Sequence, residues 1–323
     1  MKHIFIINPI AGKGKYQHDI EDNINDYFRY KDIDYDIYIT KYKGDAKKFV
    51  TNKCEENIPY IFYSCGGDGT LHEVVNAAFG YKHVNVGLIP CGTGNDFVRN
   101  FDNVNNFENI EFQVQGNSIN LDIIKIKDEY AVSVCNIGLD ADAAFNMHKF
   151  KKIPFISGNI CYILSVIYCL MNSLGKNLYI EINDKEKING KFLLSVVANG
   201  HSYGGGYKCA PLAKIDDEIL DVCLVKNISR LKILGLINSY KSGKHLEEDN
   251  IKKYIEYRKC KNVKIKSDSH INLCIDGESY IYDEVDFEIV HNAFNFWVPK
   301  GTAVQNYENI KRKESEKNEN INC

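Results

Sequence analysis

The first part of the chain alternates short apolar runs with longer polar-faced segments. Apolar runs typical of strands lie at 3–7, 34–39, 60–65 and 86–89. Helices are predicted between them, near 16–30, 45–52 and 71–79. Strands that alternate with helices in this way predict an open parallel sheet, so this part is expected to form an α/β domain.

From about residue 121 the pattern changes to short apolar runs separated by polar or glycine turns. These runs predict an antiparallel β domain with one or two inserted helices, and they lie at 121–127, 130–136, 178–182, 192–199, 219–225, 263–266, 271–275 and 287–290. The last residues are polar and are expected to fray. We therefore predict domains at 1–125 and 126–305, followed by a polar tail at 306–323.

One segment, 160–171, is apolar throughout except for Ser165. It is shorter than the roughly 20 residues that a membrane span needs. The pattern favours a buried helix. The alternative is a helix that lines an apolar pocket or touches a bilayer, helped by Lys149, Lys151 and Lys152 just before it.

Three glycine-rich loops follow predicted strands in the first hundred residues. They read Asn8-Pro9-Ile10-Ala11-Gly12-Lys13-Gly14, Gly66-Gly67-Asp68-Gly69-Thr70 and Gly92-Thr93-Gly94-Asn95-Asp96. Glycine lets backbone N–H groups approach a phosphate closely, and a helix that begins after such a loop adds its positive dipole end. Three such loops at the carboxyl ends of parallel strands predict a single phosphate-binding crevice.

Composition and charge argue against several classes of protein. The chain has 323 residues, 44% of them hydrophobic, and a net charge of −3, which argues against a dedicated nucleic-acid partner. Its start has no secretory signal pattern, and its eleven cysteines include no CxxC pair. We expect a cytoplasmic protein with reduced core thiols rather than disulfides or zinc.

Acidic residues within and beyond the loops have both structural and chemical interpretations. Asp68 beside a phosphate cradle makes sense if Mg²⁺ neutralises both charges, whereas Thr70 could cap the following helix. Asn95 and Asp96 repeat this choice in the third loop. Asp216-Asp217-Glu218 could bind a cation or form a solvated turn. Asp276-Gly277 is a strong hairpin signal, and from the residues alone Glu278 is more easily explained as part of that turn than as a catalytic group.

In this order, the motifs resemble the soluble diacylglycerol kinase family of bacterial lipid kinases, whose catalytic domain sphingosine and ceramide kinases share. The resemblance spans residues 8 to about 279. GGDGT alone is shared with NAD kinases, but GGDGT followed by PxGTxNDFxR and a late DGE is highly specific. The matching segments are NPIAGKGK, TKYKGDAKKF, GGDGTLHEVVNA, IPCGTGNDFVRNF, LDIIKI, NIGLDADA, NGHSYGGGYKCAPLAKIDDEILDV, SGKH and IDGES.

The resemblance implies an amino-terminal α/β domain like that of phosphofructokinases and NAD kinases, a carboxyl-terminal β-sandwich, and ATP in the cleft between them. It makes Glu278 the general base and assigns Asp68, Asp96 and Asp122 to the Mg²⁺ of Mg·ATP. A second, structural Mg²⁺ would sit at Asp217 with the carbonyls of Lys214 and Ile219. The implied nucleotide-binding residues are Asn8, Pro9, Gly12, Gly14, Thr40, Gly66, Gly67, Asp68, Gly69, Thr70, Leu71, His72, Thr93 and Asn95.

This chain departs from the family at two positions. Glu218 stands where the family has glycine, which would strain the loop of the structural metal if that loop needs a positive φ. His72 stands where asparagine is common. The resemblance implies a lipid acceptor, most simply diacylglycerol converted to phosphatidic acid, transient contact with the inner membrane surface, and compatibility with a homodimer. An NAD kinase and a non-catalytic nucleotide or lipid sensor remain alternatives.

Overall fold

The computed structural model describes residues 1–14, 16–150, 158–172 and 174–305. Contacts within the chain define two compact units. The first comprises Met1–Asp122, Lys214–Asp217 and the chain from His291, and the second comprises Ile123–Ala213 and Glu218–Val290. The domain limits expected from the sequence stay predictions, and the polar tail, 306–323, lies outside the described residues.

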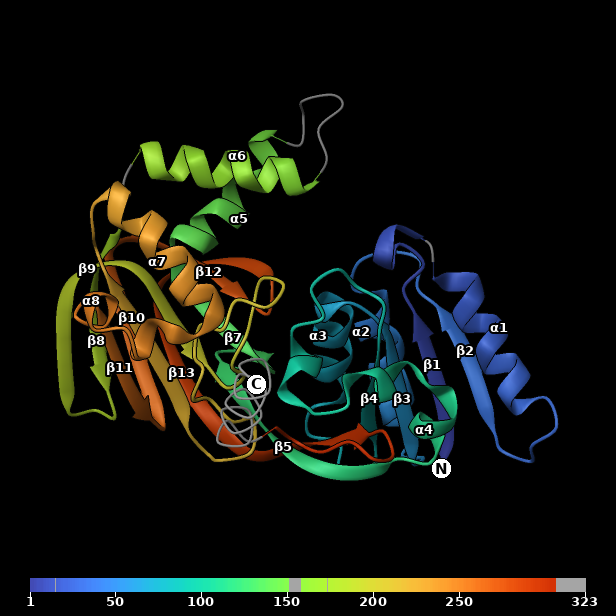
Figure 1. The fold of residues 1–323 in the computed structure, drawn as a ribbon. Helices are drawn as coiled ribbons and strands as arrows, with labels where there is room; N and C mark the ends of the chain where they lie inside the picture. Colours follow the sequence, from blue (N-terminus) through green and yellow to red (C-terminus); the bar gives the residue numbers. More distant parts are fainter. Residues whose placement is uncertain (15, 151–157, 173, 306–323) are drawn as a thin grey trace, which may run out of the picture. The chain divides into compact units, whose positions relative to one another are not determined.

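The first unit is built on a parallel sheet with the order β2-β1-β3-β4 (Figure 1). The end of β13 (Glu278–Val298) pairs in parallel with β4 through Phe296 and Val86. This confirms the predicted α/β class. The strands are β1 Lys2–Ile7, β2 Tyr35–Ile39, β3 Tyr60–Gly66 and β4 Asn85–Pro90. The helices are η1 Ala11–Gly14, α1 Gln17–Phe28, α2 Asp45–Glu55, α3 Asp68–Ala78, η2 Phe97–Asn100, η3 Val104–Glu108 and α4 Ile110–Val114.

The side-chain alternation of the strands places helices on both faces of this sheet. Phe5 and Ile7 of β1 pack with Ile24 and Phe28 of α1 in one apolar cluster. β3 is buried along its whole length, as expected of a central parallel strand that is covered on both sides. The rigid sheet therefore presents the loops that follow β1, β3 and β4 at one common edge.

The second unit is mainly antiparallel, with the strand order β11-β10-β9-β7-β12-β13 and with β8 paired to both β9 and β12. The strand β5 (Asn117–Ile126) contributes residues to both units. The remaining strands are β6 Glu129–Ala131, β7 Val134–Gly138, β8 Lys176–Ile182, β9 Glu186–Ala198, β10 Leu220–Lys226, β11 Ile255–Cys260 and β12 Asn262–Ile275. The helices are α5 Leu139–Phe150, α6 Gly158–Met171, α7 Arg230–Ser242, η4 Lys244–Leu246 and α8 Asp249–Lys252.

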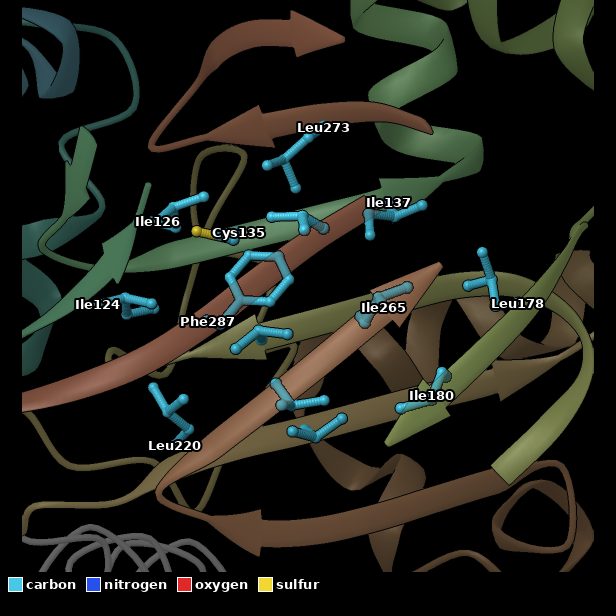
Figure 2. Packing of buried hydrophobic residues seen from close by; sticks show 14 of the residues in the cluster. Ile124, Ile126, Cys135, Ile137, Leu178, Ile180, Leu220, Ile265, Leu273 and Phe287 are labelled. Carbon is cyan, nitrogen blue, oxygen red and sulfur yellow. The ribbon is translucent and has the colours of Figure 1, made fainter. Parts of the chain in front are cut away.

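The strands of the second unit separate two apolar cores. Figure 2 shows the larger core, in which Leu178, Ile265 and Phe287 pack together. Neighbouring residues of β10 enter different cores: Val222 lies in this one, and Cys223 lies in the core against α7. Burial on both faces explains why β10 is a continuous apolar run, and the arrangement confirms the expected β-sandwich.

The structure corrects three predictions for this part of the chain. The run at 130–136 forms two strands, β6 and β7, rather than one. The runs at 263–266 and 271–275 belong to one strand, β12, whose register shifts between Lys266 and Ile271. Four α-helices, α5 to α8, are present among the described residues of the second unit rather than one or two.

The helix predicted at 160–171 forms as α6, but it is not buried as a whole. Cys161, Ser165 and Cys169 face inward, whereas Ile163 and Ile167 are exposed. The expectation of a buried helix was therefore wrong. Of the basic residues before it, Lys149 lies in α5, and Lys151 and Lys152 fall outside the described residues. No helix among the described residues is both long enough and apolar enough to cross a membrane.

Candidate active site

Backbone and side-chain hydrogen bonds join the three glycine-rich loops in the first unit. The Asn8 N–H donates to the Cys65 carbonyl (3.0 Å), and the Cys91 N–H donates to the Gly66 carbonyl (2.8 Å). The Asn8 amide Nδ2 also donates to the Thr70 hydroxyl (3.0 Å). The loops after β1, β3 and β4 therefore form one connected surface, and its role as a phosphate-binding crevice stays a prediction.

Two of the glycines are required by close backbone contact between the loops. A Cβ on Gly92 would lie 2.5 Å from the Gly67 Cα, which is too close for any side chain. A Cβ on Gly12, whose φ is +57°, would lie 2.7 Å from the Cys91 carbonyl oxygen. These glycines bring three backbone segments together, and close packing of backbones exposes N–H groups rather than side chains.

Asp68 connects the second loop to the third. It is the first residue of α3, and its Oδ1 accepts hydrogen bonds from the backbone N–H of Asp96 (2.8 Å) and of Phe97 (3.4 Å). A carboxylate at a helix N-terminus is favoured by the helix dipole. Asp68 thus has a structural task, and it also places negative charge at the position where a magnesium-bound phosphate was predicted.

The helix-capping explanation of Thr70 is not supported. The helix α3 begins at Asp68 with Gly67 as its N-cap, so Thr70 lies inside the first turn and its hydroxyl accepts from Asn8. Asp96 precedes the 3-10 helix η2 and makes no capping hydrogen bond through its side chain; the Arg99 guanidinium lies 3.4 Å from its Oδ1.

The loop after β2 is tied to the same edge of the sheet. The buried Thr40 donates its N–H to the Ile7 carbonyl at 2.9 Å. The Gly44 N–H donates to the Glu73 carboxylate of α3 at 2.8 Å. Sequence reasoning did not single out Glu73. Its position one turn after GGDGT, on the helix that follows the loop, is the signal that could have found it.

Asp122 and the segment 214–217 form a second acidic group in the first unit. The buried Asp122 accepts hydrogen bonds through Oδ1 from His291 Nδ1 (2.7 Å) and from the Asn292 N–H (3.0 Å). The Asp122 N–H donates to the Ile215 carbonyl (2.9 Å). Burial, together with the negative charge of Asp122, raises the pKa of Asp216 above its usual range.

The donor chemistry of both acidic groups fits magnesium, which takes carboxylate and carbonyl oxygens and keeps several waters. Neighbouring carboxylates such as Asp122 and Asp216 also repel each other unless a cation neutralises them. Among the described residues, no three His, Cys, Asp or Glu side chains come together as a group that could hold a metal ion. The metal assignments of Asp96, Asp122, Lys214, Asp217 and Ile219 stay predictions.

The expected strain at Glu218 is present. Its φ is +63°, in the left-handed region that favours glycine. Its carboxylate forms an ion pair with Lys261 at 2.8 Å, but both side chains are exposed, so this pair contributes little. The loop therefore keeps the backbone conformation of a glycine loop although it carries a glutamate.

Glu278 begins β13 in the second unit, directly after a two-residue hairpin turn. Asp276 and Gly277 have φ values of +46° and +94°, and Glu278 pairs with Ile275 across the turn. Two positive φ values match the type I′ turn that Asp-Gly favours. The hairpin prediction was therefore correct, and the turn fixes the start of the strand from which the partly buried Glu278 projects.

Asp276 holds this turn against the preceding strands. Its Oδ2 accepts the N–H of Val132 at 2.7 Å, and its Oδ1 accepts those of Ser133 and Val134 at 3.0 Å each. These three N–H groups are taken from the ladder, which explains why β6 and β7 are separate strands. Sequence reasoning treated Asp276 only as a turn former and missed this role.

One further acidic residue of the second unit was noted only as part of a motif. Asp140 lies in the first turn of α5, and burial raises its pKa to about 7. Perturbed carboxyl groups are enriched at functional sites, although structural networks also produce them. The ten described cysteines are free and buried, and their thiols are explained as core packing.

Comparison with known proteins agrees with this arrangement. Residues 2–126 match the diacylglycerol kinase catalytic domain, and residues 133–297 match the YegS C-terminal NAD kinase beta sandwich-like domain. The chain is therefore an enzyme of the lipid kinase class. It belongs to the family in which a diacylglycerol kinase catalytic domain is followed by a YegS-type C-terminal domain.

Curated relatives and solved structures are similar over most of their lengths. A protein of Shewanella frigidimarina named "Probable lipid kinase YegS-like" is 26% identical over 271 residues, which cover 82% of this chain and 84% of the relative. A Staphylococcus aureus relative with a provisional lipid kinase name is 27% identical over 263 residues, which cover 80% and 84%. A Bacillus anthracis structure provisionally titled a diacylglycerol kinase has a TM-score of 0.70 and 23% identity, covering 92% of this chain and 95% of the other. The similarity to the Bacillus anthracis structure shows a shared fold.

Proposed function

We propose that this protein transfers the γ-phosphate of ATP to a lipid hydroxyl, with diacylglycerol as the expected acceptor and phosphatidic acid as the product. The observation that carries the proposal is the joining of three glycine-rich loops around Asp68 at one edge of a parallel sheet. The family supports a lipid acceptor, because relatives of similar length are named lipid kinases.

The nucleotide is held by backbone groups in this proposal. The tight contact of Gly67 with Gly92 leaves loop N–H groups to face the phosphates, and the N-terminus of α3 adds its positive dipole end. Magnesium, when bound, neutralises charge on the phosphates as they transfer. The carboxylates that we assign to it are those of Asp68, Asp96 and Asp122; the backbone N–H of Asp96 donates to Asp68 Oδ1 at 2.8 Å, which ties the second loop to the third.

The acceptor hydroxyl is activated by Glu278. Its carboxylate takes the hydroxyl proton while the oxygen forms a bond to the γ-phosphorus, and the bond from that phosphorus to the β–γ bridging oxygen breaks to release ADP. General-base help of this kind is typically worth about 10²–10⁴-fold in rate. The hairpin that Asp276 fixes supports this role, because a base must be held in a set direction.

Glu278→Gln is the direct test of the base. The amide cannot take the proton, so kcat for phosphate transfer to a short-chain diacylglycerol should fall by about 10²–10⁴-fold. The affinity for Mg·ATP, followed by fluorescence of a labelled analogue, should change less than about threefold. The substitution leaves the proposed contacts between the glycine-rich loops and the nucleotide unchanged. Near-normal turnover in this variant would remove Glu278 from the mechanism.

The same assay separates the alternatives. Transfer to NAD instead of a lipid would make the chain an NAD kinase. Nucleotide binding without transfer to lipid or NAD would indicate a sensor. Parallel assays with a sphingoid base, an undecaprenol-like alcohol and phosphatidylglycerol would identify the acceptor, since Glu278 chemistry applies to any hydroxyl.

A further inference from the structure

The helix α6 packs with its small residues inward and its large apolar residues outward. Cys161, Ser165 and Cys169 lie 1%, 0% and 7% exposed, and they recur every four residues along one face. The opposite side carries Ile160 (46% exposed), Ile163 (56%), Ile167 (46%) and Met171 (76%). A helix that only covered a core would turn its large apolar residues inward and its small residues outward, since burial of large apolar side chains contributes the most stabilising free energy.

Specific contacts fix this orientation. The Ser165 hydroxyl donates to the Ala143 carbonyl of α5 at 2.6 Å, which holds the small face against α5. At the other end, Arg230 of α7 donates to the carbonyl of Leu170 in the last turn (2.6 Å) and to that of Asn172 just after the helix (3.3 Å). Rotating α6 to bury its isoleucines would break these hydrogen bonds.

The exposed apolar surface extends beyond α6. Leu231 follows Arg230 directly and is 83% exposed. Tyr162 and Tyr168 are 38% and 39% exposed on α6. Figure 1 shows α6 at the outer edge of the second unit, on the far side of α5 from the β-strands. Tyrosines with an apolar ring and a polar hydroxyl are typical of membrane–water interfaces.

The two chain segments that carry this surface contain basic residues and no carboxylates, although Asp142 and Asp268 of neighbouring elements line a pocket with Tyr168. The sequence has no Asp or Glu at 143–180 or at 222–246, although the chain carries 43 acidic residues in total. Among the described cations of these segments, Lys149 lies 4.5 Å from the Tyr168 ring centroid, and Lys232 donates to the Tyr254 hydroxyl at 2.9 Å. A second copy of the same face would bring like charges together, whereas an anionic surface would attract them.

We infer that the outward face of α6, defined by Ile160, Ile163, Ile167 and Met171 and extended by Leu231, docks on an anionic lipid bilayer. The helix has 14 residues, a length of about 21 Å, so it lies in the interface rather than crossing it. This deepens the proposed function, on which it rests for its purpose: it brings the kinase to a surface that contains its substrate.

Sedimentation with sucrose-loaded vesicles tests the docking surface. The full chain should bind vesicles of phosphatidylcholine with 30% phosphatidylserine more tightly than vesicles of phosphatidylcholine alone. I163E combined with I167E should weaken binding at least tenfold, because two carboxylates would enter an anionic, apolar boundary. Lys232→Gln should weaken binding to the anionic vesicles about fivefold, as expected for one cation near the surface.

A matched control carries the same two added carboxylates elsewhere. Tyr30 and Ile58 are 90% and 46% exposed in the first unit, and Y30E combined with I58E should leave vesicle binding within twofold of the native chain. Circular dichroism and thermal unfolding should show that both double variants are folded. Equal binding by all three proteins would overturn the proposal, and so would a native dimer that I163E with I167E converts to monomer without changing vesicle binding.

Activity readouts separate this inference from the proposed function. On a water-soluble short-chain diacylglycerol, I163E with I167E should keep native turnover; on vesicles, its turnover should fall with its binding. Vesicle binding that depends on α6, in a protein that phosphorylates no lipid, would retain the docking surface and reject the kinase. Full turnover on vesicles despite lost binding would reject the docking surface as the route to the substrate and retain the kinase.

Discussion

At the scale of single residues, the site combines positions that sequence could identify with positions that only structure explains. Asp68 and Glu278 were predicted from motifs, and their local settings are now defined. Asp276 was predicted only as a turn former, and its carboxylate also accepts three backbone N–H groups from 132–134. A sequence cannot show such a role, because the partners are more than 140 positions away.

Glu218 supplies a stability prediction at this scale. Because its φ of +63° costs a non-glycine residue roughly 1–2 kcal/mol, Glu218→Gly should raise the free energy of unfolding by about 1 kcal/mol after the loss of the exposed Lys261 pair. Urea unfolding measures this directly. Glu218→Ala is the control, since it removes the same ion pair but keeps a Cβ; equal stabilisation by both variants would show that φ is not the cause.

At the scale of elements, strands and helices with strong periodicity were predictable, and interruptions were not. The parallel strands appeared where expected because their runs are apolar on both faces and bounded by glycine loops. The division between β6 and β7 depends on Asp276, and the joining of two runs in β12 depends on a register shift between Lys266 and Ile271. Both are tertiary effects that override local pattern.

The orientation of α6 could not be predicted either. Its sequence is apolar all round, so periodicity shows no preferred face. The inward face is chosen by the Ser165 hydrogen bond to α5 and by Arg230 at the helix end. A buried helix was the simplest expectation from composition. It was wrong because the small residues of α6, rather than its isoleucines, pack closely against α5.

The contact between the second and third glycine loops gives an element-scale prediction. Gly92→Ala should lower the free energy of unfolding by about 1–3 kcal/mol and weaken Mg·ATP binding, because the new Cβ forces the loops apart. Gly235→Ala is the comparison: no atom lies within 4 Å of its added Cβ, and α7 should gain about 0.5–1 kcal/mol. Stability and nucleotide affinity unchanged by G92A would mean that the loops tolerate separation.

At the scale of the whole molecule, the class of both units followed from the sequence, and their detailed composition did not. The first unit takes in Lys214–Asp217 and the chain from His291, far from its other residues in sequence. The hydrogen bonds of Asp122 to Ile215 and His291 hold these segments in place. No local sequence pattern shows that such distant segments join the first unit. The order of the motifs, in contrast, was enough to indicate the family.

Each unit contains a buried histidine that should make the protein sensitive to acid. Burial lowers the pKa of His3 and of His245 to about 4, below their unfolded value near 6.5. The unfolded chain therefore binds protons first as the pH falls, and stability is lost between pH 6.5 and 4. From pH 7 to pH 5 each histidine should remove about 2 kcal/mol, measured by urea unfolding.

Histidine variants identify the groups responsible. Replacing His3 or His245 by phenylalanine should flatten the fall in stability between pH 7 and pH 5, whatever the variant costs at pH 7. This window lies above the range in which most carboxylates titrate. An unchanged slope in both variants would assign the acid sensitivity to other groups.

The most direct measurement of the central claim is transfer of radiolabelled phosphate from ATP into a mixed lipid extract in the presence of magnesium, with the native chain and Glu278→Gln side by side. The account predicts one labelled lipid with the native protein, expected to be phosphatidic acid, and its loss with the variant. No labelled lipid from a native chain that still binds ATP, or equal labelling by both proteins, would contradict it.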